Sequence, residues 1–372
     1  MLSYRSFHRF KDIPKGVWSQ LLQKEDYFLS EEFLVTVEKH HQAEIGPIYT
    51  LVEDEKGVVG ILYAQVFDFK NKKLNNYIES QKFNLITRLK SQMGRLLKLK
   101  VAFLGNVFMS NEPAFKFKKG HFTIEQTEEI LSHIQKFSGT KFLLIPDFYK
   151  DAIDSSSRKI KQISVEPDMY FEVSKDWNDF DDYLTAIRSK YKKRYHTNQK
   201  ISKSIVQKII EPIELLSKAP ALKALFAEVY ENSNFNSVKF NTDMFLELND
   251  LNKNICIHGY YNGNDLLGFS SVFKVNRILY AHFVGFSYET NHKYDLYSKM
   301  LYDHIRFAID HDVELMKLGR TACEFKSNFG AKPHLEKGYV YDKTGRYLYF
   351  LGPFLDLLKP KAWVQRKPFK EG

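Results

Sequence analysis

Two stretches of the sequence, about 200 residues apart, contain the same predicted elements in the same order. Each begins with two β-rich segments joined by a glycine-containing turn, which predicts an antiparallel hairpin: 48–53 with 58–67, and 255–261 with 266–273. A further strand, an amphipathic helix and a short buried strand follow each hairpin: 101–108, 124–137 and 141–145, then 278–286, 294–309 and 314–318. The chain is therefore predicted to form two α/β domains of similar architecture, each with a mixed α+β sheet.

The boundary between the domains is predicted in a polar segment, 151–164, which has no apolar periodicity and contains three consecutive serines. We expect an N-terminal domain over residues 1–155 and a C-terminal domain over residues 156–372. The length of 372 residues agrees with two or three domains at about 150 residues each.

Composition excludes several classes of protein. An apolar content of 44% is that of a folded chain, and two cysteines are too few for a disulfide framework. No metal-ligand motif is present, so no metal is expected. No apolar run reaches the roughly 18 to 20 residues of a membrane span, and Arg5, His8 and Arg9 interrupt the start where a signal peptide needs apolar residues. We expect a cytoplasmic protein, peripheral on the inner face of a membrane at most.

The net charge of +10 favours anionic partners, and the positive charge gathers in particular segments. Residues 75–100 place apolar side chains at helical spacing among lysines and arginines, which predicts a basic amphipathic helix suited to an anionic membrane surface. Residues 186–203 contain no acidic residue and suit a tRNA phosphate track, a lipid or acyl-carrier-protein surface, or an ordinary solvated face. Residues 347–367 combine aromatic with basic side chains, as in a membrane-interface anchor or in final elements docked on the core.

Three motifs occur in order within the second stretch: Tyr280-Ala281-His282-Phe283-Val284-Gly285, the helix start Tyr294-Asp295-Leu296-Tyr297, and Leu318-Gly319-Arg320 followed by Glu324-Phe325-Lys326-Ser327-Asn328-Phe329-Gly330. In this arrangement the chain resembles the GNAT superfamily, and specifically its FemAB-like branch of tandem N-acyltransferases, described as predicted cell-envelope acyltransferases. The resemblance implies two tandem GNAT-like (acyl-CoA N-acyltransferase) domains over most of the chain, with the chemistry in the C-terminal domain.

The sequence departs from the superfamily pattern where the donor's pyrophosphate would be held. Relatives that use acetyl-CoA have a glycine-rich loop before the crossover helix, and its backbone amides bind the phosphates. Here residues 289–295 contain no glycine, so side chains such as His292 and Lys293 become the candidates for binding an anionic donor. This departure favours an acyl-carrier protein or an aminoacyl-tRNA over conventional acetyl-CoA.

Acyl transfer to an amine needs a proton acceptor, an acid for the leaving group, and groups that hold the donor. In a GNAT-like sheet the fourth and fifth strands splay apart, and these groups meet in the resulting cleft. His282 on the fourth strand is either the base or a hydrogen-bonded core histidine, and alternation places it on one face with Tyr280 and Val284.

The segment after the fifth strand supplies further candidates. Glu324 could accept the amine proton, unless it lies on an ordinary solvated helix, while Arg320, Lys326 and Tyr280 could bind the donor or acceptor. Tyr297, one turn into the crossover helix, either protonates the leaving group or simply caps and packs the helix.

These features predict an N-acyltransferase that moves an acyl group from a thioester, either acyl-CoA or acyl-carrier protein, to a primary amine. An amino-lipid of sphingoid type or another envelope precursor suits the basic amphipathic segments. One rival is FemAB-like transfer of an aminoacyl group from tRNA to a peptidoglycan precursor. The other is a catalytically inactive, membrane-associated binding module.

Overall fold

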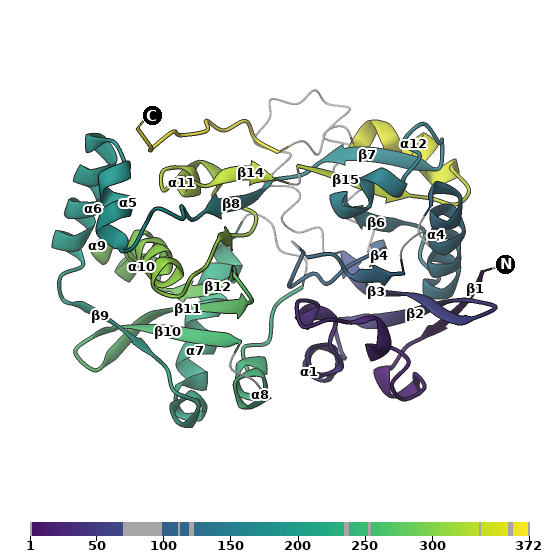
Figure 1. Ribbon diagram of the computed structural model, residues 1–372, viewed down its shortest axis with the longest axis horizontal. Coiled ribbons are helices and arrows are strands. Elements are labelled where there is room, and N and C mark those ends of the chain that lie inside the picture. Colours follow the sequence, from purple (N-terminus) through teal and green to yellow (C-terminus); the bar gives the residue numbers. More distant parts are fainter. Residues whose placement is uncertain are drawn as a thin grey trace. The chain divides into compact units, whose positions relative to one another are not determined.

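The computed structural model describes residues 2–69, 99–110, 112–118, 123–233, 238–251, 254–334, 336–355 and 360–370. The chain divides into two compact α/β units, both visible in Figure 1. Unit 1 comprises Met1–Val165, Asn234–Phe240 and Leu335–Lys361, and unit 2 comprises Glu166–Ser233, Asn241–His334 and Ala362–Gly372. In the described part of the chain, no helix has the length and apolar run needed to cross a bilayer.

Unit 1 is built on one mixed sheet. Its strands are β1 (Ser3–Phe7), β2 (Gly46–Asp54), β3 (Gly57–Phe69), β4 (Leu99–Phe103), β5 (Phe115–Phe117), β6 (Leu143–Pro146), β7 (Ile160–Ser164) and β15 (Lys337–Tyr341). They lie in the order β1-β2-β3-β4-β6-β15-β7, with β5 on β3. Among the strand pairs of the described residues, β4–β6 is parallel and the others are antiparallel. Its helices are α1 (Glu31–His40), α4 (Ile124–Ser138) and α12 (Arg346–Leu355), with short 3-10 helices at Phe10–Asp12, Ser19–Leu21, Tyr27–Leu29 and Asp147–Ala152.

The core of unit 1 forms where α4 packs on the sheet. Ile130, Leu131 and Ile134 of α4 share one buried cluster with Ile48 of β2 and Leu62 of β3. The helix begins with a capping box between Thr123 and Gln126 and ends at Gly139, whose φ of +65° suits glycine. The predicted β2–β3 hairpin and the helix predicted over 124–137, which is α4, are therefore confirmed. The strand expected over 101–108 is β4, which ends at Phe103.

The first segment of unit 1 ends at Val165, whereas the sequence placed the division between residues 155 and 156. Two strands explain this difference. β7 lies inside the polar segment expected to be a linker, and it pairs with β15 from near the end of the chain. β15 also pairs with β6, so Tyr339 lies between Ile145 and Gln162. Because both strands complete one sheet, unit 1 extends to Val165 and includes residues that the sequence placed in the C-terminal domain.

The basic helix expected over residues 75–100 lies mostly outside the described residues. Its last two residues, Leu99 and Lys100, belong to β4, where Lys100 pairs with Asp68 of β3. These two residues are therefore in a strand and not in the predicted helix.

Unit 2 contains the second mixed sheet. Its strands are β8 (Asp168–Glu172), β9 (Ile205–Ile209), β10 (Ile255–Asn262), β11 (Asp265–Val275), β12 (Ile278–Phe286), β13 (Leu315–Lys317) and β14 (Lys332–His334). They lie in the order β14-β8-β13-β12-β11-β10-β9. In the part of this unit that the structure describes, β12–β13 is parallel and the other strand pairs are antiparallel. Its helices are α5 (Phe180–Ala186), α6 (Ser189–Ile201), α7 (Pro212–Asn232), α8 (Met244–Leu251), α9 (Tyr288–Tyr294), α10 (Leu296–Asp310) and α11 (Cys323–Ser327).

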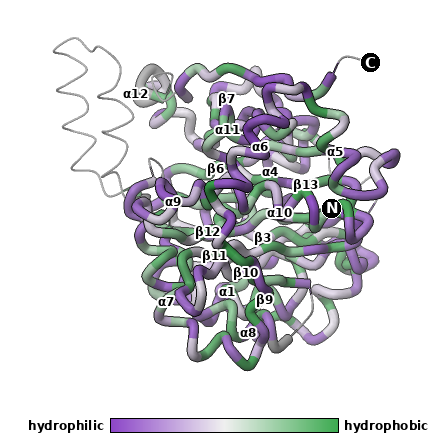
Figure 2. The backbone as a smooth tube through the Cα atoms, turned by 90° about the vertical axis from the view of Figure 1, so that its left-hand side faces the viewer, coloured by the Kyte–Doolittle hydropathy of each residue, from purple (hydrophilic) through white to green (hydrophobic). Residues whose placement is uncertain are grey.

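Helices cover both faces of the unit 2 sheet: α7 and α8 lie on one side of β10–β12 and α10 on the other (Figure 1). Leu301 and Ile305 of α10 share a buried cluster with Leu279 of β12, Met316 of β13 and Phe171 of β8. Figure 2 shows green, hydrophobic stretches among purple ones in the region of the strands, and apolar side chains of both sheets form the two cores. The predicted β10–β11 hairpin is confirmed, and the crossover helix predicted over 294–309 corresponds to α10, which the unpredicted short helix α9 precedes.

The C-terminal segment docks on unit 2 through the glycine that closes the third motif. Gly330 has a φ of +116°, and a Cβ there would lie 2.4 Å from the ring of Phe369. Phe369 packs beside Phe171 and Trp177, and Lys370 donates its backbone N–H to the carbonyl of Ala186. The glycine is therefore required both by backbone conformation and by the close approach of an aromatic ring.

We expect Gly330→Ala to lower the free energy of unfolding by about 2 to 4 kcal/mol, since it adds backbone strain and displaces the Phe369 ring. Gly263→Ala is the matched control, because Gly263 also has a positive φ, of +60°, but has no atom within 4 Å of the added Cβ. Urea denaturation of both variants measures the difference. Equal losses in the two proteins would show that the Phe369 contact contributes nothing.

Candidate active site

The parallel strands β12 and β13 pair over only three residues. The partners are Ile278 with Leu315, Leu279 with Met316, and Tyr280 with Lys317. β12 then continues to Phe286, while the chain leaves β13 after Lys317 and turns into α11. Within residues 254–334, the far half of β12 therefore has only β11 as a strand partner. The two strands part next to Tyr280, as the family resemblance implied.

A β-bulge lies on β12 just beyond this point. The register shifts between Ser270 and Val272, so that His282 and Phe283 both stand opposite Ser271. The Ser271 hydroxyl fills the bulge: it accepts the backbone N–H of Phe283 at 3.1 Å and lies 3.2 Å from His282 Nδ1. The extra residue moves Val284 onto the α10 face, where it packs with the cluster of Leu296. The expected alternation of Tyr280, His282 and Val284 on one face is thus interrupted.

His282 lies among aromatic rings on the face covered by α7 and α8. Its ring centroid is 5.1 Å from Phe273, 6.2 Å from Phe245 of α8 and 4.1 Å from Phe283. Burial lowers the pKa of His282 to about 3, because the apolar surroundings disfavour its charged form. A histidine this weakly basic is a poor proton acceptor near neutral pH, so the core interpretation fits better than the catalytic one.

A group of charged residues surrounds the end of β13. Lys317 is 8% exposed, and its Nζ lies over the rings of Tyr280, at 5.2 Å, and Tyr170, at 5.4 Å. Asp168, at the start of β8, is fully buried, and its carboxylate oxygens accept no hydrogen bond from a described residue. Burial raises the pKa of Asp168, while the positive charges of Arg320, Lys326 and Lys317 act in the opposite direction.

Lys326 points inward and holds the loop that follows β13. It is 4% exposed, and its Nζ donates to the carbonyls of Gly319 at 3.0 Å and Arg320 at 2.9 Å. Burial lowers the pKa of Lys326 to about 8, and the negative charge of Asp168 counteracts part of this effect. In this structure Lys326 thus supports the loop from inside, whereas the sequence analysis named it as a residue that could bind the donor or acceptor.

The loop itself has a strained backbone. Gly319, Thr321 and Ala322 have positive φ angles of 74°, 68° and 50°, and this region is especially unfavourable for the β-branched Thr321. Arg320 donates from Nη1 to the carbonyl of Glu166 at 2.5 Å, which ties the loop to the residues before β8. Strain of this kind persists only where surrounding contacts enforce it, and it is concentrated at functional sites.

Glu324 lies apart from this charged group. Its side chain is 42% exposed and forms an ion pair with Arg366 of the C-terminal segment. The hydrogen bond from Arg366 lowers the pKa of Glu324, which makes its carboxylate a weaker proton acceptor. The solvated-helix interpretation therefore fits Glu324 better than the role of a base.

Tyr297 lies where β12, α10 and α11 meet. Its ring stacks on Phe325 of α11 with centroids 5.2 Å apart and lies 6.0 Å from Phe286 at the end of β12. Burial raises the pKa of Tyr297, and the electrostatic interaction with Cys323 raises it further. The pKa of Cys323 is itself raised by burial and by the negative charges of Glu166 and Asp168. Tyr297 is thus a protonated hydroxyl close to the group around β13.

A pocket of about 660 Å³ borders the same region. Basic residues spaced along one stripe of α6, namely Lys190, Lys193 and Arg194, form one wall of this α6–α10 pocket. The opposite wall contains Phe325, the ring that stacks on Tyr297, and Ser298 in the first turn of α10. The predicted basic segment 186–203 is therefore a helix with one cationic stripe on a pocket next to the parted strands.

Asn198 and Asp295 shape the floor of the α6–α10 pocket. Asp295 separates α9 from α10 with a φ of +48°, and Asn198 Nδ2 donates to both its carbonyl and its carboxylate at 2.9 Å. Asn198 is fully buried, and its Oδ1 has no hydrogen-bond partner among the described residues. An unpaired buried acceptor facing a pocket is a position where a ligand N–H can bind.

The structure thus brings Arg320 and Lys326 together beside Asp168, while Tyr280 contacts Lys317 and Tyr297 contacts Phe325 and Cys323. The other candidates lie outside this group. His292 and Lys293 are exposed on α9 and do not line the α6–α10 pocket. Sequence reasoning missed Glu166 just before β8, Asp168 at the start of β8 and Lys317 at the end of β13. No local motif marks them, and only the pairing of β8 with β13 brings them together. Among the described residues, no group of histidine, cysteine or carboxylate side chains could hold a metal ion.

Comparison with solved structures identifies the fold. A tandem GNAT protein from the clavulanic acid biosynthesis pathway matches over 92% of this chain and 99% of its own, with 9% identity and a TM-score of 0.54. FemX matches over 86% of this chain and 93% of its own, with 10% identity and a TM-score of 0.50. L-PGS from Bacillus licheniformis matches over 91% of this chain and 97% of its own, with 9% identity and a TM-score of 0.50. Neither a family model nor a curated protein matches the sequence. The chain has the tandem GNAT fold, which confirms at the level of fold the resemblance to FemAB-like proteins.

We expect Lys326→Met to lower the free energy of unfolding by about 3 to 5 kcal/mol, since it removes the donor to the carbonyls of Gly319 and Arg320 and one of the positive charges that act on the buried Asp168. Adding Asp168→Asn should recover part of this loss because the carboxylate that has lost this charge is removed. Lys332→Met removes an exposed lysine that pairs with Glu172 and is the control, with a change of about 1 kcal/mol or less. Equal losses in the two lysine variants, measured by urea denaturation, would contradict the internal role of Lys326.

His282 should make stability depend on pH below neutrality. Its pKa of about 3 in the folded chain lies below the unfolded value of 6.5, so only the unfolded chain binds the proton as the pH falls. Its contribution is fully present above pH 6.5, and about 2 kcal/mol is lost by pH 5. His282→Gln should therefore weaken the pH dependence of urea midpoints, with His292→Gln as a control. An unchanged pH dependence in His282→Gln would refute the neutral buried state.

Proposed function

We propose that the chain is an N-acyltransferase that moves an acyl group from an activated, phosphate-bearing donor to a primary amine. The observation that carries this proposal is the end of β12–β13 pairing at Tyr280 and Lys317, together with the partly buried Tyr297 and a cationic pocket in the same unit. The tandem GNAT fold supports the same class of reaction. A primary amine of an amino-lipid or another envelope precursor is the acceptor that we favour.

The reaction needs two proton transfers, and the described residues offer a group for each. The amine nitrogen attacks the donor carbonyl carbon, the new C–N bond forms, and the bond from that carbon to the thioester sulfur breaks. Tyr297 gives its proton to the leaving thiolate and regains one from solvent, since burial keeps the hydroxyl protonated beforehand. Asp168 accepts the proton lost by the amine, because its raised pKa makes it a stronger base than an ordinary carboxylate.

The α6–α10 pocket is the proposed place for the phosphates of the donor. Residues 289–295 lack the glycines of a phosphate-binding loop, whereas Lys190, Lys193 and Arg194 present three positive charges beside the first turn of α10. Side-chain cations would then replace the usual backbone amides. Acyl-CoA and the phosphopantetheine arm of acyl-carrier protein share this phosphate chemistry.

Transfer of an aminoacyl group from tRNA is the second candidate function. The observation in its favour is that the acid-free segment continues past the pocket, with exposed Lys200, Lys203 and Lys208 leading from α6 into β9. A tRNA phosphate backbone is long enough to contact lysines outside the pocket, whereas coenzyme A is not.

Thermal shift with two matched triple variants distinguishes these donors. If coenzyme A binds the pocket, it should raise the melting temperature of the wild type and of Lys200→Gln/Lys203→Gln/Lys208→Gln, but not of Lys190→Gln/Lys193→Gln/Arg194→Gln. If tRNA is the donor, both triple variants should lose affinity for it, with a shallower salt dependence. Failure of both ligands to stabilise the wild type would contradict the proposed donor site.

Tyr297→Phe and Asp168→Asn should each lower the rate of acyl-amine formation by about 100-fold or more while donor binding is retained. His282→Gln should stay within about threefold of the wild type, since a neutral core histidine transfers no proton. Mass spectrometry of the acylated amine measures all three variants. A larger loss in His282→Gln than in Tyr297→Phe would reverse the assignment.

A further inference from the structure

The last part of unit 2, residues 363–370, lies against α11 and reaches the junction between α5 and α6 (Figure 1). We call this segment the C-terminal strap. Trp363 and Phe369, near its two ends, are partly buried against the cluster that α10 forms with the sheet. The strap is therefore packed on the core of unit 2.

Two backbone hydrogen bonds join the strap to the chain just before α6. The N–H of Arg188 donates to the carbonyl of Pro368 at 2.8 Å, and the N–H of Lys370 donates to the carbonyl of Ala186 at 3.0 Å. Arg188 is the N-cap residue of α6, and Lys190, a cation on the wall of the α6–α10 pocket, follows two residues later. The helix that carries the cations therefore begins at backbone that the strap holds.

The middle of the strap is bonded to α11. The backbone N–H of Arg366 donates to Ser327 Oγ at 3.0 Å, and its guanidinium forms the ion pair with Glu324. Asn328, which follows α11, lines the α6–α10 pocket and accepts a hydrogen bond from Arg194 of α6 at 2.5 Å. The strap thus holds both α11 and the start of α6, and these two helices supply opposite walls of the pocket.

The ring of Phe369 fixes the chain beside the same wall. Its closest neighbour is Gly330, which directly follows Phe329, a residue that lines the pocket. The Phe329 ring lies 4.7 Å from that of Tyr302 of α10, which lines the pocket as well. Loss of the Phe369 ring would therefore release backbone next to the pocket.

We propose that the C-terminal strap positions the walls of the α6–α10 pocket and thereby sets its affinity for the donor phosphates, an inference that rests on the donor site proposed above. Lys190, Lys193 and Arg194 can bind one group of phosphates together only while α6 keeps its place against α11, because cations on a helix move with it. Among the described residues, those that line the pocket do not include the strap. The strap therefore acts through the walls and not by contact with the ligand.

Two double variants of the full chain test this role. Arg366→Ala/Phe369→Ala removes the ion pair and the buried ring, whereas Val364→Ala/Lys367→Ala removes one apolar side chain and one cation from exposed positions of the strap and is the matched control. Hydrogen exchange of α6 amides, followed by mass spectrometry, should become about tenfold faster in the first variant and stay unchanged in the control.

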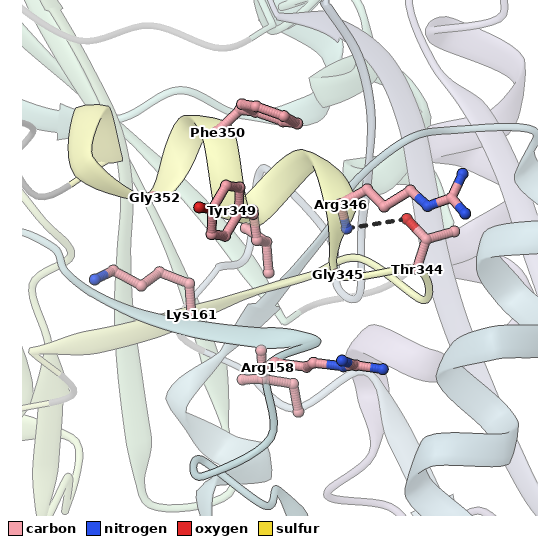
Figure 3. Close-up of a pocket in the computed structure, with 10 residues that line it drawn as sticks. Arg158, Lys161, Thr344, Gly345, Arg346, Tyr349, Phe350 and Gly352 are labelled. Carbon is pink, nitrogen blue, oxygen red and sulfur yellow. Dashed lines mark hydrogen bonds between the residues drawn. The ribbon is translucent and has the colours of Figure 1, made fainter.

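Two elements serve as references for the exchange measurement. Strand β11 reports on the fold of unit 2, because it lies within the sheet. Helix α12 reports on unit 1, where it borders another pocket, of about 630 Å³, beside the residues that lead into β7 (Figure 3). Exchange in both elements should be the same in the two variants and the wild type.

Titration with coenzyme A gives the second readout. Its Kd should rise about tenfold in Arg366→Ala/Phe369→Ala, if about one molecule in ten keeps the competent pocket, and stay within about twofold of the wild type in the control. Faster exchange in α6, without binding of coenzyme A to the wild type, would support the positioning role and reject the donor assignment. Unchanged exchange in α6, an equal increase in β11, or faster exchange in α6 with an unchanged Kd would overturn the inference.

Discussion

The arrangement of unit 2 depends on the point where β12 and β13 stop pairing. Backbone hydrogen bonds join the two strands only as far as Tyr280 and Lys317, and the polar backbone beyond must be satisfied in other ways. On β12 the Ser271 hydroxyl occupies the bulge, and beyond β13 the Lys326 ammonium takes the carbonyls of Gly319 and Arg320. The Ser271 hydroxyl and the Lys326 ammonium are thereby placed inside the protein, and burying a polar group lowers stability unless its hydrogen bonds are satisfied. The parted strands are therefore maintained by buried side chains on both sides.

Much of this architecture could be predicted because its signals are local. Alternation and glycine turns located both hairpins, and the span of β12 agrees with its predicted range of 278–286. The return of β15 to unit 1 could not be predicted, since strand pairing across more than 150 residues leaves no pattern in either segment. The short helix α9 was not predicted, because its separation from α10 depends on the left-handed conformation of Asp295, whose carbonyl and carboxylate accept from Asn198.

The candidate site was only partly predictable, for a related reason. Arg320, Lys326 and Tyr297 lie in the motifs that carried the resemblance, so their neighbourhood could be found from sequence. The directions of the side chains could not be predicted. Lys326 points inward to a loop with positive φ angles, whereas Glu324 points outward to Arg366. Asp168 was missed because a single aspartate at the start of a strand carries no signal of its own, and its importance follows from burial without a hydrogen bond from a described residue.

The position of β15 bears on how the chain is synthesised. The sheet of unit 1 places β15 between β6 and β7, yet about 170 residues separate β7 from β15 in the order of translation. At ribosomal rates of about 5 to 20 residues per second, β6 and β7 emerge roughly 10 to 35 seconds before the strand that joins them. During that interval two strand edges of the nascent protein remain open to other chains, so protection by a chaperone would matter most before translation ends.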